Sequence, residues 1–298
     1  AEHRSLLRVL TAPRHSDLID RMTWRLAAPL AELVDRHAES RADLDTLRAV
    51  VAAADRTGEL AAQAAGRLGL GRELARRHQL TEARHHLELA LGACQQLGDR
   101  AGTARAWRNL SLVAEGLGEH EEARRLATSA MAVFRTLGER AGLARALRGI
   151  SGIHRELGEH TQAAGRAEEA LSLVRHAQDP TTEARTWNEL GAAYHRLADH
   201  RRAVGAHMQA LALHRALGDR HGEAMTLDAL GDAHHAAGNR GEARRCWSLT
   251  VTFLDTAGFP DETGARRKLA RARAGSTVVT PARARGGPTA VAPAGPAG

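Results

Sequence analysis

Arginine side chains recur every 40 residues in the middle of this chain, and they are the residues best suited to chemistry. One register holds Arg105, Arg145 and Arg185, and a second register, three residues further on, holds Arg108 and Arg148. A guanidinium group presents a planar fork of donors that can bind a carboxylate through two hydrogen bonds. The row could therefore clamp an acidic segment, although arginines that are solvated or paired within the chain would give the same pattern.

Other polar residues continue the same 40-residue spacing. The arginine registers continue into Asn188 and Asp228, and neighbouring registers contain Arg155, His195, Asp232 and His235. The two aspartates would reverse the charge at one end of the row and could fix the direction of a bound acidic segment. We therefore expect these residues, together with the five arginines, to form one peptide-binding site.

Catalytic and cofactor sites have weaker support. The chain has 17 histidines, but no cysteine or carboxylate stands at metal-ligand spacing beside them and HExxH is absent. Cys94 and Cys246 have no base in register to activate them, and they lie too far apart in a rod-like array to pair. The glycines at 66, 69 and 71 have the wrong spacing for a dinucleotide loop. We predict no enzyme activity, no metal and no cofactor.

The elements that must position the arginines also repeat every 40 residues. Glycines fall on a 20-residue ladder, which predicts two helix ends per repeat because glycine readily adopts the left-handed conformation of a helix C-terminus. His78, Gln178 and Ala198 stand at three positions of this 20-residue spacing where glycine is absent, and we expect the turns there to close differently. Small residues recur in three further registers, which are Ser111, Ser151, Gly191 and Gly231; Ala83, Ala123, Ala163, Ala203 and Ala243; and Ala90, Ala130, Ala170, Ala210 and Thr250.

Large residues stand beside the small ones, as in a densely packed helix interface. They are Trp107, Leu147, Trp187 and Leu227 in one register, and Leu110, Ile150, Leu190 and Leu230 in another. A fixed period with this alternation predicts an all-α fold made of stacked helix pairs, because each pair can bury its apolar face only against its neighbours.

The repeat resembles the tetratricopeptide (TPR) family. Trp187, Leu190, Gly191, Tyr194, Ala203 and Ala210 match the Trp-x-x-Leu-Gly-x-x-Tyr…Ala-x-x-x-Phe-x-x-Ala signature, with His207 in the phenylalanine place. The other copies match in part, and the period of 40 exceeds the usual 34. The resemblance implies a TPR-like α-solenoid, which is a right-handed superhelix of helix–turn–helix repeats. It also implies that the arginine registers lie on the concave face of the first helix of each repeat.

The composition limits the classes of partner. The formal net charge is +7, but Lys268 is the only lysine among 42 basic Lys and Arg residues, which is typical of a coding bias toward arginine. We therefore do not take the high charge as evidence for nucleic-acid binding. The cysteines indicate reduced thiols, the residues from Ala1 onward do not have the pattern of a signal peptide, and no segment of the sequence is long and apolar. We predict a cytoplasmic protein without membrane contact, and because it begins at Ala1 we expect it to be a piece of a longer chain.

The chain divides into four predicted parts. Residues 1–58 contain N-terminal helices, at about 2–10 and 16–37, and a degenerate first repeat. Residues 59–260 form an array of five repeats, and residues 261–274 form a polar capping helix. Residues 275–298 are rich in Pro, Ala and Gly and have little apolar bulk, which predicts disorder.

The N-terminal stretch adds a second resemblance. The apolar residues at 6–9, Trp24 to Ala27 and the stretch 45–54 resemble the segment that leads into the TPR array of actinobacterial SARP-type and STAND-type transcription regulators. This implies the C-terminal sensor or interaction part of a regulator that binds a protein or an acidic peptide, and that touches nucleic acid only through upstream domains. The alternative is a receptor of quorum-sensing type that binds a signal peptide or small ligand in the same groove. The oligomeric state stays open.

Overall fold

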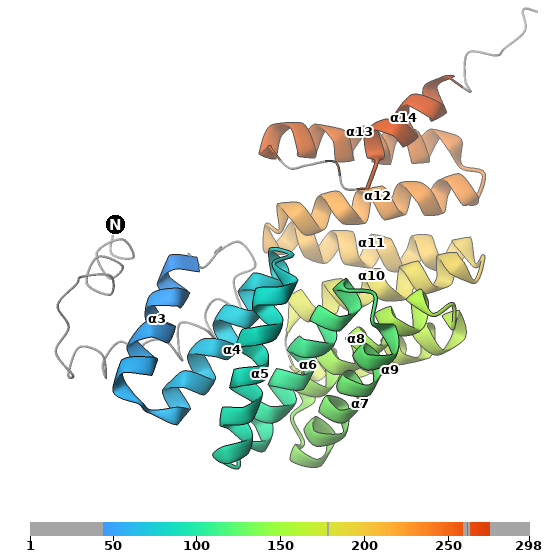
Figure 1. Cartoon of the computed structure of the whole chain (residues 1–298). Helices are drawn as coiled ribbons and strands as arrows, with labels where there is room; N and C mark the ends of the chain where they lie inside the picture. Colours follow the sequence, from blue (N-terminus) through green and yellow to red (C-terminus); the bar gives the residue numbers. More distant parts are fainter. Residues whose placement is uncertain (1–43, 178, 259–260, 262, 275–298) are drawn as a thin grey trace, which may run out of the picture.

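The computed structural model describes residues 44–177, 179–258, 261 and 263–274, and it is all-helical over these residues. Figure 1 shows the helices stacked in chain order from α3 to α14. No helix among the described residues is long and apolar enough to cross a membrane. The helices are α3 (Leu44–Thr57), α4 (Leu60–Arg76), α5 (Leu80–Gln96), α6 (Arg100–Gly116), α7 (His120–Leu137), α8 (Arg140–Glu156), α9 (His160–Ala177), α10 (Pro180–Arg196), α11 (His200–Leu217), α12 (Arg220–Ala236), α13 (Arg240–Ala257) and α14 (Ala265–Ala274).

The glycine ladder ends the helices as predicted. The described glycines at this spacing all have φ between +66° and +81°. They are Gly58, Gly98, Gly118, Gly138, Gly158, Gly218, Gly238 and Gly258. In the turn after α6, the amide of Glu119 donates to the carbonyl oxygen of Ala114 at 2.8 Å. This left-handed closure satisfies carbonyl groups that the helix leaves without partners.

The prediction that the turns at His78 and Ala198 close differently is wrong. Both residues have φ of 58°, in the same left-handed region as the glycines. The amide of Asp199 donates to the carbonyl oxygen of Tyr194 at 3.0 Å, which is the bond that also closes the glycine turns. The packing of the flanking helices therefore imposes one turn geometry on whichever residue stands there. Gln178 lies outside the described residues.

Replacing Ala198 by glycine is expected to stabilise the array. A residue with a Cβ pays about 1–2 kcal/mol for the left-handed conformation, whereas glycine adopts it freely but loses more chain entropy on folding. We expect Ala198→Gly to raise the free energy of unfolding by about 0.5–1 kcal/mol, as measured by urea denaturation. Ala237→Gly is the matched control, because Ala237 ends α12 with φ of −74° and gains no relief. Equal effects of the two substitutions would contradict the argument.

Small side chains let the two helices of each repeat approach closely, as predicted. Ala83, Ala123, Ala163, Ala203 and Ala243 are all 0% exposed. A Cβ built on Gly191 would lie 2.7 Å from the His207 ring, and one built on Gly231 would lie 2.5 Å from the Trp247 ring. The second helix thus fills, with one large side chain, the space that the first helix leaves empty.

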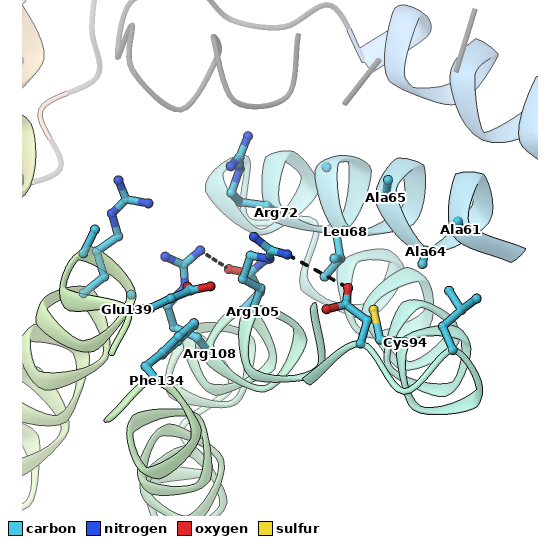
Figure 2. A pocket seen from close by; sticks show the side chains of 17 residues that line it. Ala61, Ala64, Ala65, Leu68, Arg72, Cys94, Arg105, Arg108, Phe134 and Glu139 are labelled. Atoms are coloured by element: carbon cyan, nitrogen blue, oxygen red, sulfur yellow. Dashed lines mark hydrogen bonds and ion pairs between the residues drawn. The ribbon is translucent and has the colours of Figure 1, made fainter. Parts of the chain in front are cut away.

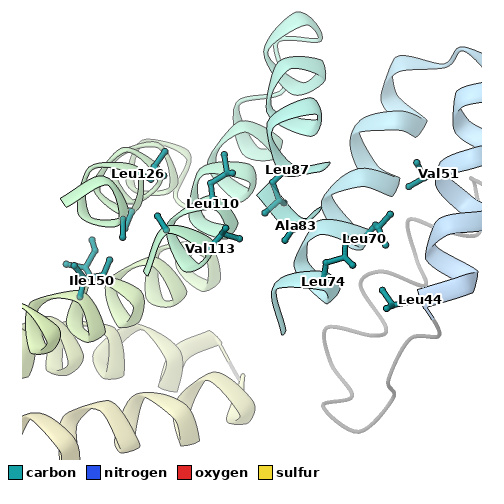
Figure 3. Close-up of a cluster of buried hydrophobic side chains, with 14 residues drawn as sticks. Leu44, Val51, Leu70, Leu74, Ala83, Leu87, Leu110, Val113, Leu126 and Ile150 are labelled. Carbon is teal, nitrogen blue, oxygen red and sulfur yellow. The ribbon is translucent and has the colours of Figure 1, made fainter. Parts of the chain in front are cut away.

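The apolar core has no single centre. Figure 3 shows one cluster that passes from helix to helix along the array. Its labelled members come from successive helices and include Leu44, Leu70, Leu87, Leu110, Leu126 and Ile150. Each repeat therefore buries its apolar face against its neighbours in the chain, as expected for a solenoid.

The ends of the array agree only in part with the sequence. The helices expected within residues 2–37 and the expected disorder of 275–298 lie outside the described residues. The capping helix begins at Ala265, whereas it was expected to begin at 261. Asp261 precedes it and accepts hydrogen bonds from the backbone amides of Ala265 at 2.8 Å and Arg266 at 3.1 Å. This carboxylate supplies acceptors for amides that the first helical turn cannot pair.

Candidate functional site

The first helices of the repeats line the inner side of the curved array. These helices are α4, α6, α8, α10 and α12, and each contacts the next one in this series. No comparable contact joins successive second helices, α5, α7, α9, α11 and α13, among the described residues. An array whose first helices are closer together than its second helices must curve toward the first helices, so their free side chains face a concave surface.

The arginine row lies on this concave surface. A hollow of about 410 Å³ is bordered by Arg105, Arg108 and Arg145, and a smaller one of about 120 Å³ extends past Arg148 to Arg185. Because Arg108 and Arg145 border both hollows, the two adjoin. The structure thus brings together all five arginines of the two main registers.

Some of these arginines are paired within the array. Arg145 donates to Asp179 at 2.8 Å and bridges α8 to the start of α10. Two hydrogen bonds from Thr182 and one from Arg145 lower the pKa of Asp179, although burial alone would raise it. Arg148 lies 3.9 Å from Glu189, and Arg105 lies 4.0 Å from Asp99. Arg105 keeps 49% of its side chain exposed, so its pairing leaves it accessible to a ligand.

Arg185 is the most available cation of the row. Its side chain is exposed in the smaller hollow, and no carboxylate of the described residues is within ion-pair distance of it. Its pKa is lowered to about 10, because the surrounding protein removes water from it and because Arg148 and Arg76 lie nearby. A cation held among other cations in a concave surface gains more from an incoming carboxylate than a cation that is already paired.

Arg155 belongs to a charged cluster in the floor of the groove. Its side chain lies 3.5 Å from Glu189, and it also pairs with Glu156 at 2.7 Å. Glu115 and Glu189 approach each other over Gly152, since a Cβ there would lie 3.3 Å from the first and 3.7 Å from the second carboxylate. Burial, and then the Glu189 charge, raises the pKa of Glu115 to about 7. The floor therefore becomes more positive below neutral pH.

Asn188 is engaged inside the array. Its Nδ2 donates to Thr226 at 2.7 Å, and its Oδ1 lies 3.1 Å from Nδ1 of His207. This polar network continues to His214, which lies 2.9 Å from Asp219. Hydrogen bonding to His214 and to the Gly222 amide lowers the pKa of Asp219 to about 2, although burial alone would raise it. Asn188 thus joins α10 to α11 and α12 and is not free for a ligand.

Asp228 and Asp232, which we expected to reverse the charge at the end of the row, are both paired within the chain. Lys268 of α14 donates to Asp228 at 2.6 Å and to Asp232 at 2.7 Å. Asp228 is only 4% exposed, and Asp232 also accepts from the indole nitrogen of Trp247 at 3.2 Å. Lys268 of the capping helix therefore occupies both carboxylates, and Asp228 is buried beside it.

The two predicted histidines lie near this acidic end. The ring centroid of His235 is 5.5 Å from that of Trp247, and the ring of His195 lies 5.8 Å from that of His200. Burial lowers the pKa of His195, and the charge of Asp232 only partly opposes this effect. No group of three potential metal ligands occurs within the described part of the chain.

Sequence reasoning missed two arginines and the apolar wall of the larger hollow. Arg72 and Arg76 extend the row onto α4, but they stand at registers that carry no arginine in the next repeat. Both cysteines are free, and burial raises the pKa of each thiol to about 11. Figure 2 shows Cys94 at the border of the larger hollow. Its thiol is neutral and weakly polar there, because its pKa is raised.

Comparison with known proteins agrees with this geometry. The family model described as "Tetratricopeptide repeat" matches residues 64–136, 116–176 and 182–246, which together exceed half of the chain. No curated protein matches the chain.

Several solved structures are similar in fold. A Rap protein in complex with competence and sporulation factor has a TM-score of 0.71 and 14% identity, and the match covers 85% of this chain and 75% of that one. BtubC (BKLC) from P. vanneervenii has a TM-score of 0.59 and 19% identity, with 84% and 97% covered. A STAND protein with a tetratricopeptide repeat sensor from Pyrococcus horikoshii has a TM-score of 0.63 and 14% identity, with 91% and 43% covered. At these identities the likeness shows the fold alone.

Proposed function

Because the chain belongs to the tetratricopeptide repeat family, we propose that its concave arginine row binds an acidic segment of a partner protein. Arg105, Arg108, Arg145, Arg148 and Arg185 form the row, and Arg185 carries the proposal, because it is exposed and lies among other cations. An acidic segment that lies along the row would place its carboxylates against these guanidinium groups in extended or helical form.

Partner binding would serve regulation. We place the chain as the sensor or interaction region of a bacterial transcription or signalling regulator, in which binding shifts the curvature of the array and so acts on domains upstream of Ala1. Support comes from the fold of the STAND protein, whose description names a tetratricopeptide repeat sensor. Nucleic acid would be contacted through such upstream domains. A nucleotide-binding loop in the residues that precede Ala1 would support this role. A natural protein that begins at Ala1 would exclude it.

A second candidate is a receptor for a signal peptide or small ligand that uses the same groove. The fold match to a Rap protein solved with competence and sporulation factor favours it. The two candidates differ in what a short ligand does alone. A short acidic peptide that by itself raises the melting temperature would favour the receptor, whereas stabilisation only by a whole partner protein would favour the scaffold.

Reversing the charges of Arg145 and Arg185 tests the proposed function. We expect the double variant Arg145→Glu/Arg185→Glu to bind a fluorescein-labelled nonaglutamate peptide at least ~10-fold more weakly than the wild-type chain in fluorescence anisotropy. Arg201→Glu/Arg240→Glu is the matched control, since it makes the same change in net charge on exposed positions of α11 and α13. Equal losses in both variants would mean that only net charge attracts the peptide, and the groove would then be excluded.

A further inference from the structure

We propose that the larger hollow beside the arginine row is an anchor pocket for one bulky apolar side chain of the bound acidic segment. The inference rests on the proposed function and names its specificity: the preferred segment carries a phenylalanine-sized or leucine-sized residue next to its carboxylates. The anchor pocket is the hollow of about 410 Å³ formed by α4, the α5–α6 junction and α8.

The apolar wall of the anchor pocket stands where the arginine row would otherwise continue. Ala65 and Leu68 of α4 occupy the same registers as Arg105 and Arg108, one 40-residue period earlier. At these two registers the surface is therefore basic from α6 to α10 and apolar at α4, whereas Arg72 and Arg76 of α4 stand at other registers. Figure 2 shows Ala61, Ala64, Ala65 and Leu68 along α4, with Arg105 and Arg108 on the other side of the pocket.

Small side chains create the space, and buried ones form its floor. The short side chains of α4, at Ala61, Ala64 and Gly69, leave space on one side of the pocket. Ala141 and Gly142 leave space in the same way at the start of α8. Below them lies Phe134, which is 1% exposed. Pockets that bind ligands are typically of this size and combine apolar walls with a few polar groups at the entrance. One aromatic side chain would fit with room to spare.

The polar groups of the pocket point to an anionic neighbour for that side chain. Arg72, Arg105, Arg108 and Arg145 border the pocket, against two carboxylates, Asp99 and Glu139. Arg145 is already paired with Asp179. Arg105 is half exposed, and its shortest distance to Asp99 is 4.0 Å, which makes this a loose ion pair. The smaller hollow, which Arg145 also borders, carries the positive charge onward to Arg185. A ligand that fills the pocket would thus have its next carboxylates over the row.

Burial of the anchor should matter more than any single ion pair. An exposed ion pair changes an affinity by about a factor of 5 or less, whereas burying one large apolar side chain changes it by about 10- to 100-fold. The arginine row would supply attraction and orientation, and the anchor pocket would supply selectivity among acidic segments.

Two peptides that differ in one residue test the inference on the full chain. Fluorescein-labelled nonapeptides with four glutamates on each side of a central phenylalanine or a central alanine are titrated in anisotropy. We expect the phenylalanine peptide to bind at least ~10-fold more tightly to the wild-type chain. In Ala65→Phe the new ring fills the pocket, so the two peptides should bind equally and about as tightly as the alanine peptide binds to wild type.

Controls separate the pocket from the rest of the surface. Ala132→Phe places the same ring on an exposed position of α7 and should leave the ~10-fold preference intact. If Ala65→Phe lowers the melting temperature, Ala61→Phe offers a second way to fill the pocket from a more exposed position. A preference that survives both filling variants would overturn the anchor pocket.

The failures of the two proposals can be told apart. If both peptides bind wild type equally, and Arg145→Glu/Arg185→Glu weakens both, the anchor pocket falls and the proposed function stands. If neither peptide binds, the proposed function fails and the anchor with it. A third outcome is that both peptides bind wild type equally, while 4-phenylbutyrate binds wild type but not Ala65→Phe. The pocket would then bind a free small acid, and the proposal of a peptide anchor would be overturned.

Discussion

Acidification should destabilise the wild-type chain relative to a His207→Phe variant by about 2 kcal/mol between about pH 7.5 and pH 5. His207 is 2% exposed, and its ring packs against Gly191. Burial, and then the charge of His195, lowers its pKa from 6.5 to about 4. Its Nδ1 lies 3.1 Å from the amide oxygen of Asn188, which fits a neutral ring that donates its proton there.

The direction of this pH effect follows from whether the folded or the unfolded chain binds a proton at His207. Between pH 6.5 and about pH 4 the unfolded chain protonates His207, whereas the folded chain does not. The stability that this residue contributes is therefore complete above pH 6.5 and is lost as the pH falls toward 4. Glu115 and Asp228 act in the opposite direction, because burial raises their pKa values to about 7 and about 6. The difference between wild type and variant isolates the contribution of His207.

Urea unfolding at a series of pH values, followed by circular dichroism, measures this difference. Phenylalanine is the residue that the repeat signature favours at this place, so the variant should pack against Gly191 much as histidine does. His85→Phe, at an exposed position of α5, is the control and should keep the wild-type pH dependence. If the free energy of unfolding of His207→Phe changes with pH as that of the wild type does, a lowered pKa of His207 does not contribute to the loss of stability in acid.

Lys268→Met should detach α14 from the end of the array. Methionine has nearly the same length but no charge, so the two hydrogen bonds to Asp228 and Asp232 are lost. Removing one partner leaves the buried Asp228 carboxylate without its cation, which is the costly way to break an ion pair. Since Lys268 is partly exposed and Asp228 can take up a proton, we expect a loss of about 2 kcal/mol.

The effect should stay local, because each element of a repeat array contacts only its neighbours. Hydrogen exchange of the α14 amides should accelerate about 30-fold, while exchange in α6 to α8 should not change. Arg271→Met removes the same charge from an exposed position of α14 that has no ion pair among the described residues. Equal acceleration in the two variants would mean that the total charge of α14, and not the bridge, holds the helix.

The repeat itself could be predicted almost completely from the sequence. The glycine ladder and the alanine registers report backbone conformation and close approach, which depend only on residues within one repeat and its neighbour. For this reason the helix ends and the buried Ala83, Ala123 and Ala163 agree with the sequence. The turns at His78 and Ala198 were missed because sequence propensity measures local preference, whereas the packing of two long helices outweighs about 1–2 kcal/mol of local strain.

The candidate site could be predicted only in part. The common face of Arg105, Arg145 and Arg185 follows from the 40-residue period. What each arginine is paired with does not, because Arg145 meets Asp179 across two helices and Asp228 meets Lys268 from a helix outside the regular repeats. The anchor pocket was also hidden, since Ala65 and Leu68 look like ordinary helix residues until α6 and α8 are placed opposite them.

The sequence alone determined that the chain is a stack of helix pairs with a row of arginines on one face, because a fixed period forces every copy into the same environment. Only the tertiary structure decided which charges remain available and where a hollow opens. Those properties depend on side chains brought together from different repeats and on the end of the array, where the period stops and Lys268 of α14 pairs with Asp228 and Asp232.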